Sequence, residues 1–162
     1  MATERRNSRW LVWFSFAVAL VLSIMPLPAA LAVWRPEWPA LALIFWVMTQ
    51  PRSYGVGIGW VLGLLEDVAR GALLGQYAFG YALVAFLTLS FYRRIRVFPV
   101  RQQAFVVMIM LVLHLSLSLW VRGVSGEDVG GWAYWAPALS SLVVWPFSYL
   151  LLRRLSDLYK VH

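Results

Sequence analysis

Residues 55–76 read GVGIGWVLGLLEDVARGALLGQ, and this stretch decides the fold. Five glycines and one acid recur in it at a constant spacing of four: Gly55, Gly59, Gly63, Asp67, Gly71 and Gly75. On an α-helix this spacing places them on one slowly drifting ridge. The ridge carries almost no side chain, and in a membrane it lets a neighbouring helix backbone pack closely. We therefore predict a helix-packing or partner-binding surface here rather than a catalytic one.

Three ionisable residues, Glu66, Asp67 and Arg70, interrupt the apolar run near its end. Glu66 and Asp67 each lie within one helical turn of Arg70, the spacing at which side chains meet, so we expect a structural salt bridge near the membrane boundary. A proton or cation site, or a docking point for a partner, are the alternatives. Adjacent carboxylates point about 100° apart on a helix, which argues against a catalytic pair sharing one proton.

The composition indicates an integral membrane protein. Of 162 residues, 62% are hydrophobic and 16% aromatic, while the 13% that are charged fall in clusters between long apolar runs. That arrangement is typical of spanning helices and excludes an alternating β-barrel. The net charge of +7 fits basic residues flanking membrane spans, so it does not predict nucleic-acid binding. The absence of cysteine excludes disulfides, thiolate metal sites and cysteine nucleophiles.

We predict an all-α transmembrane bundle of six helices forming one integral membrane domain over residues 1–162. The expected spans are 10–33, 40–50, 55–70, 73–92, 104–121 and 132–152. The second and third are short, so they cross as thin or tilted spans or form a re-entrant pair, and charge counting favours two crossings. Pro26 and Pro28 should kink the far end of the first span. The N-terminus also has features of a cleavable signal, but Trp10, Trp13 and the later spans favour an anchor.

Placing both termini in the cytoplasm puts eleven of the fourteen basic residues on that side. The remaining three are Arg35, Arg70 and Arg122. The densest cytoplasmic cluster is Arg93, Arg94, Arg96 and Arg101, which reflects topology or else binds a cytoplasmic partner or anionic lipid. The other cytoplasmic basic residues are Arg5, Arg6, Arg9, Arg52, Arg153, Arg154 and Lys160.

No catalytic, cofactor or metal motif is present in the sequence. GxSxG and GxxxxGK[ST] are both missing, and no Ser, His and acid set has a catalytic spacing. His114 has no second ligand type within four residues, so we expect it to hydrogen-bond across helices in the company of Ser116 or Ser118. His162 is terminal. We predict a protein that is not an enzyme.

Several short motifs, in order, resemble the rod shape-determining protein MreD family of Gram-negative bacteria over essentially the whole chain. The most specific are Arg35-Pro36-Glu37-Trp38 and the glycine-rich block with Asp67, Gly71 and Gly75. Glu66 departs from the family pattern, in which an aliphatic residue is usual. The other motifs are Met25-Pro26-Leu27-Pro28, Gln50-Pro51-Arg52 and Val144-Trp145-Pro146-Phe147.

The resemblance implies a non-enzymatic component of the bacterial inner membrane that supports rod shape and side-wall peptidoglycan synthesis. Its implied partners are MreC, bound directly, and through it MreB, RodA and a penicillin-binding transpeptidase. MreC would dock through the glycine ridge or a neighbouring groove. The family also resembles the substrate-binding components of energy-coupling-factor transporters in helix arrangement. The alternative function is therefore a small-molecule or lipid-binding transporter subunit, with a pocket near Asp67, Arg70 and Gln76.

Overall fold

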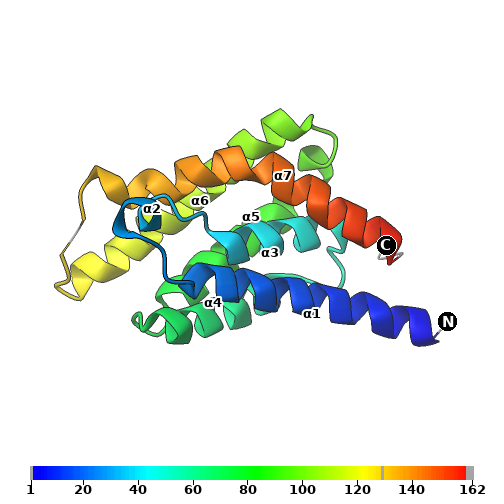
Figure 1. Ribbon diagram of the computed structural model, residues 1–162, viewed down its shortest axis with the longest axis horizontal. Helices are drawn as coiled ribbons and strands as arrows, with labels where there is room; N and C mark the ends of the chain where they lie inside the picture. Colours follow the sequence, from blue (N-terminus) through cyan, green and yellow to red (C-terminus); the bar gives the residue numbers. More distant parts are fainter. Residues whose placement is uncertain (1, 129, 160–162) are drawn as a thin grey trace.

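The computed structural model describes residues 2–128 and 130–159, and within those ranges the secondary structure consists of helices and their connections, with no strand (Figure 1). Lys160 of the expected basic tail and the terminal His162 lie outside them. The elements are α1 (Ala2–Ile24), α2 (Ala29–Ala32), α3 (Trp38–Thr49), α4 (Val56–Arg70), α5 (Gln76–Ile95), α6 (Val100–Val124), the 3₁₀ turn η1 (Trp132–Trp135) and α7 (Ala136–Leu158). The predicted fold class, all-α, is confirmed.

The short helix α3 forms the centre of the molecule. Every residue from Pro39 to Met48 is buried, because α1, α5, α6 and α7 all pack against it. Pro39 lies in the first turn, where a missing N–H costs nothing. The helix ends before Pro51, which disfavours helical geometry in the preceding residue, Gln50. The sequence of α3 is apolar on every face because other helices pack against it on all sides.

The other long helices surround α3 as an open ring. Neighbouring contacts run from α1 to α4, α5, α6 and α7, with the α4–α5 pair the most extensive. Among the described helices, α7 and α1 make no comparable contact that would close the ring. An apolar groove of about 300 Å³ lies along this seam, with Val18 of α1 and Leu151 of α7 on its walls and Leu41 of α3 beneath them. We call it the α1–α7 groove.

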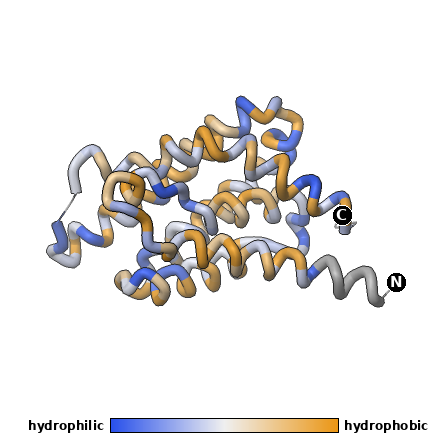
Figure 2. The backbone as a smooth tube through the Cα atoms, viewed as in Figure 1, coloured by the Kyte–Doolittle hydropathy of each residue, from blue (hydrophilic) through white to orange (hydrophobic). Residues whose placement is uncertain are grey.

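The surface is apolar over much of its area. Large hydrophobic side chains are exposed on α1, α4, α5, α6 and α7, including Phe14, Val68, Phe86, Ile109 and Phe147. Exposed apolar area of this extent indicates contact with lipid. Two segments, Val100–Val124 and Trp132–Leu158, are long and apolar enough to cross a membrane by length and composition. In Figure 2, most of the strongly hydrophilic residues lie toward the two ends of the bundle.

The first predicted span differs from the structure. Instead of one kinked helix over 10–33, α1 begins at Ala2 and ends at Ile24, and a separate single turn, α2, follows Pro28. Met25 and Leu27 each precede a proline, which disfavours helical backbone at both positions. Two such residues in succession end the helix instead of bending it.

The predicted glycine ridge is also shorter than the sequence suggested. Gly71 adopts a left-handed conformation (φ 64°) and ends α4, while Gly75 (φ 102°) precedes α5. Only Gly59, Gly63 and Asp67 therefore share a face within α4, with Gly55 at its start. A constant spacing of four does not predict the end of α4 at Gly71, because a glycine is suited both to a helix-packing ridge and to a helix C-terminus.

What remains of the ridge packs against α5. A Cβ atom on Gly59 would lie 2.7 Å from the Tyr81 carbonyl oxygen, and one on Gly63 would lie 2.5 Å from the Tyr77 carbonyl oxygen. No side chain fits at such distances, so the two backbones touch directly. The bare face is thus occupied by the chain's own next helix.

Charge is divided between the two ends of the bundle. The described start of α1, the α3–α4 and α5–α6 connections and the end of α7 lie together at one end, which we call the basic end (Figure 1). The α4–α5 turn and the α6–η1 loop lie at the other. The described arginines of the basic end are Arg9, Arg52, Arg93, Arg94, Arg96, Arg101, Arg153 and Arg154.

Candidate functional site

A buried ionic cluster lies toward the end opposite the basic end, and α4 supplies its centre. Arg70 Nε donates a hydrogen bond to Glu66 Oε1 at 2.5 Å, one helical turn away. The Glu66 side chain is fully buried, and 23% of the Arg70 side chain is exposed. The four-residue spacing that predicted a salt bridge thus brings these two groups together.

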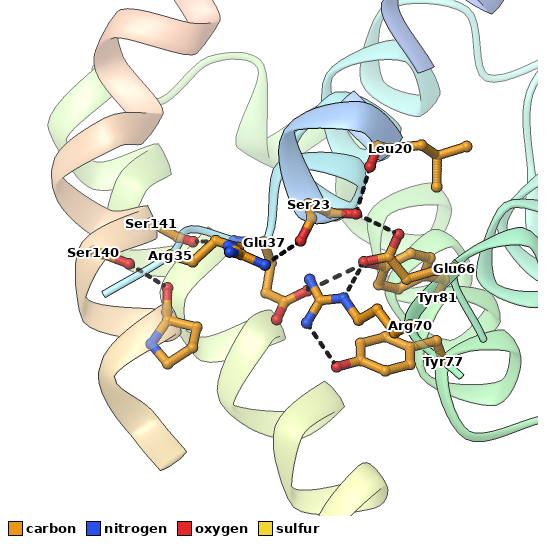
Figure 3. Close-up of polar contacts among 11 residues, drawn as sticks. Leu20, Ser23, Arg35, Glu37, Glu66, Arg70, Tyr77, Tyr81, Ser140 and Ser141 are labelled. Atoms are coloured by element: carbon orange, nitrogen blue, oxygen red, sulfur yellow. Dashed lines mark hydrogen bonds and ion pairs between the residues drawn. The ribbon is translucent and has the colours of Figure 1, made fainter. Parts of the chain in front are cut away.

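A second carboxylate, that of Glu37, joins the same guanidinium. Glu37 immediately precedes α3, and its Oε2 lies 3.6 Å from Arg70 Nη2 (Figure 3). Tyr81 of α5 donates its hydroxyl to the same oxygen at 3.3 Å, and the Glu37 backbone N–H donates to Ser141 Oγ of α7 at 3.1 Å. The segment before α3 is therefore fastened to α4, α5 and α7 at once.

The end of α1 is tied to the cluster by Ser23 and Arg35. Ser23 Oγ donates to Glu66 Oε2 at 2.9 Å. The Arg35 guanidinium donates to the carbonyl oxygens of Ser23 and Met25, at 2.5 and 2.6 Å. A cation on the free carbonyls of a helix C-terminus is favourable for both its charge and its hydrogen bonds. Of the interfacial motif predicted from Arg35, Pro36 and Trp38, Arg35 thus holds α1, and the half-buried Trp38 begins α3.

Asp67 does not join this cluster, contrary to the expected pairing with Arg70. Its carboxylate accepts hydrogen bonds from the backbone N–H groups of Gly75 at 2.8 Å, Tyr77 at 2.7 Å and Ala78 at 3.4 Å. These are free donors at the start of α5, where a negative charge is stabilised. Asp67 therefore fixes the α4–α5 turn, while Glu66 on the next helical face reaches Arg70.

Aromatic rings complete the cluster. Arg70 Nη1 donates to the Tyr77 hydroxyl at 2.9 Å, and the guanidinium lies 4.9 Å from the Tyr77 ring centroid. The His114 ring of α6 lies 5.5 Å from the Tyr77 ring and 5.1 Å from the Tyr81 ring. It packs directly on Gly80, where a side chain would collide with it.

The expected hydrogen bond of His114 across helices is wrong for the described residues. Both of its ring nitrogens are buried without a hydrogen-bond partner there, and Ser116 donates instead to the Val112 carbonyl oxygen of its own helix. The described residues also contain no group of three or more acidic or histidine side chains placed to hold a metal ion.

The four-residue spacing predicted the contact of Glu66 with Arg70, but no pattern in the sequence predicted that Ser23, Glu37, Tyr77 or Tyr81 would join them. The sequence carries only weak signals for these residues. Glu37 is the single acid in a short segment bounded by prolines and tryptophans, and Tyr77 follows Arg70 by seven residues, which equals two helical turns. The contacts themselves join segments far apart in the sequence, which one sequence cannot show. As arranged, the charged groups bond to one another and hold α1, α3, α4 and α5 together.

These features define the class: a helical membrane protein fastened by internal ion pairs. A sequence model of the family rod shape-determining protein MreD matches residues 4–155, so the chain belongs to this family. A curated relative, the rod shape-determining protein MreD of Haemophilus influenzae (strain ATCC 51907 / DSM 11121 / KW20 / Rd), is 26% identical over 156 residues, covering 94% of this chain and 96% of the relative. No solved structure matches the chain. The resemblance to MreD is confirmed, and the likeness to transporter components stays a prediction.

Proposed function

We propose that this protein is a non-enzymatic inner-membrane component of the bacterial cell-elongation machinery, which binds MreC directly and supports rod shape and side-wall peptidoglycan synthesis. MreB, RodA and the penicillin-binding transpeptidase belong to the same complex in this proposal. The observation that carries it is membership of the rod shape-determining MreD family over residues 4–155. The ion pairs support a scaffold role, because the charged groups bind one another and hold the helices together.

The proposed topology is six membrane segments with both termini in the cytoplasm. It is supported by the gathering of eight described arginines at the end where the chain starts and finishes. α3, with twelve residues, extends about 18 Å, and α4, with fifteen, about 22 Å, so both fall short of a hydrocarbon core of about 30 Å. Their ends reach the membrane surfaces through local thinning and flanking residues.

The docking place for the membrane helix of MreC in this proposal is the α1–α7 groove. The ridge residues Gly59 and Gly63 already contact α5, so they leave no room for a second backbone. The groove is open along the seam of the ring, and its lining is predominantly apolar. It follows α1 from Leu11 to Leu22, about 16 Å, or three turns of a packed helix.

Filling the groove tests this proposal. Val18→Trp with Leu151→Trp places two bulky rings on its walls, where the native side chains are partly exposed and do not support the core. We expect loss of MreC from the purified complex and rounded cells. Val21→Trp with Leu150→Trp is the matched control, since both residues are exposed on the same two helices and lie outside the groove. Full MreC retention by the groove variant, at normal membrane levels, would reject this docking place.

The alternative of a small-molecule or lipid-binding transporter subunit calls for polar groups free to meet a ligand near Asp67, Arg70 and Gln76. Asp67 and Arg70 are instead engaged with backbone groups, carboxylates and a tyrosine. Native mass spectrometry of the purified protein distinguishes the two functions, because a stoichiometric vitamin-sized ligand favours the transporter subunit.

A further inference from the structure

A second cavity, of about 320 Å³ and polar lining, opens at the basic end. It lies where the ends of α3, α5 and α7 meet, and its polar walls come from all three. Phe45 and Met48 of α3 give it an apolar side. We call it the basic-end pocket, and its polar residues are Thr49, Arg96, Tyr149, Arg153, Ser156 and Asp157.

The charge of this pocket is positive. Arg96, which directly follows α5, and Arg153 of α7 are far apart in the sequence, and one carboxylate, Asp157, accompanies them. Neither guanidinium forms an ion pair within the part of the chain that the structure describes, and Asp157 lies beyond ion-pair distance of both. The Arg153 guanidinium lies 6.0 Å from the Tyr149 ring centroid, which orients it without neutralising it. Two guanidinium groups lining one pocket suit an oxyanion with several oxygens.

The setting of the pocket favours a phosphate carried by a lipid. On α7 the surface leading away from Arg153 is apolar, with Leu150 one turn before it 52% exposed and Phe147 71% exposed. An acyl chain can therefore lie along α7 while its headgroup occupies the pocket. Within the pocket two arginines face one carboxylate, and this positive balance favours a headgroup with net negative charge over a zwitterionic one.

We propose that the basic-end pocket binds the phosphate of an anionic phospholipid, such as phosphatidylglycerol, through Arg96 and Arg153. This site is separate from the ionic cluster and from the α1–α7 groove. It does not depend on MreC binding, so its failure leaves the proposed scaffold function standing.

The test is native mass spectrometry of the purified full chain, incubated with equal amounts of phosphatidylglycerol and phosphatidylcholine. We expect selective retention of phosphatidylglycerol. Arg96→Gln with Arg153→Gln should lower that retention about ten- to thirtyfold, since each substitution removes a direct charge-assisted contact with the phosphate, worth about a factor of three to five. Arg94→Gln with Arg154→Gln removes the same charge from the same end, outside the pocket, and should change it little.

Two further arms exclude other occupants. Excess inorganic phosphate should leave the lipid bound, and displacement would assign the pocket to a soluble phosphate. A hexaglutamate peptide should also fail to displace it, whereas displacement would assign the pocket to an acidic protein segment. Equal losses in the two double variants, or no preference in the wild type, would overturn the proposal. Arg96→Lys with Arg153→Lys, which keeps the charge, should restore part of the retention and shows that a loss is not misfolding.

Discussion

Arg70 Nη2 lies 3.6 Å from Glu37 Oε2, so the last residue of α4 faces the residue that precedes α3. The same guanidinium also holds the fully buried Glu66. One cation therefore pairs with two buried carboxylates. Removing it leaves two buried carboxylates without a compensating positive charge, which is strongly destabilising.

Arg70→Leu should consequently lower the free energy of unfolding by about 3–5 kcal/mol, measured by denaturation in detergent. Arg122→Gln is the control. The Arg122 and Glu127 side chains pair at 3.5 Å but are 35% and 48% exposed, so its loss should cost less than about 1 kcal/mol. Adding Glu37→Gln and Glu66→Gln to Arg70→Leu should recover much of the stability. Equal melting of Arg70→Leu and Arg122→Gln would show that the pair does not fasten the fold.

Gly63→Ala should destabilise the protein although it adds one methyl group. The new Cβ would meet the α5 backbone at Ala78 and lie 2.5 Å from the Tyr77 carbonyl oxygen, so α4 and α5 must separate. Overpacking of this kind costs about 1–3 kcal/mol. Gly57→Ala on the same helix meets nothing within 4 Å and should be neutral or slightly stabilising. The comparison is by thermal unfolding, and similar losses in both variants would contradict the close contact.

Asp67→Ala should loosen the start of α5. The carboxylate accepts hydrogen bonds from the Gly75 and Tyr77 backbone N–H groups, so their amides should exchange with deuterium about five- to thirtyfold faster in the variant, for a loss of about 1–2 kcal/mol. Asp67→Asn keeps one acceptor oxygen, so its amide exchange rates should lie between those of the wild type and Asp67→Ala. Asp128→Ala, in the exposed loop after α6, is the control. Unchanged exchange over residues 75–78 would mean that Asp67 does not anchor this turn.

Single cysteines can test the proposed topology without background, because the chain has none of its own. We expect Asp128→Cys to react with a membrane-impermeant maleimide in intact spheroplasts. Val97→Cys, 82% exposed at the basic end, should react only after the membrane is broken. The reverse pattern would place the basic end outside the cell.

Much of the fold could be predicted from apolar runs and helix stop signals. The ranges of five of the six expected spans overlap the helices α3 to α7, because Pro51 and Pro99 mark helix boundaries that local chemistry sets. The break after Ile24 required judging how two closely spaced prolines act together, and Gly71 looked like a continuation of the ridge. The site was harder to predict. The Glu66–Arg70 pair is local, but the contacts of Ser23 with Glu66 and of Glu37 with Tyr81 arise from tertiary packing, which has no signature in spacing.

α3 is wrapped by its neighbours along its whole length, and this constrains the order in which the protein can be made. A segment of twelve residues is too brief to enter a bilayer stably by itself, and α5 and α7, which cover it, are synthesised later. During synthesis α3 must therefore remain unpacked until α5 and α7 have been made and cover it. Translation products that stop at Gly55 should leave α3 open to added protease, while full-length chains protect it.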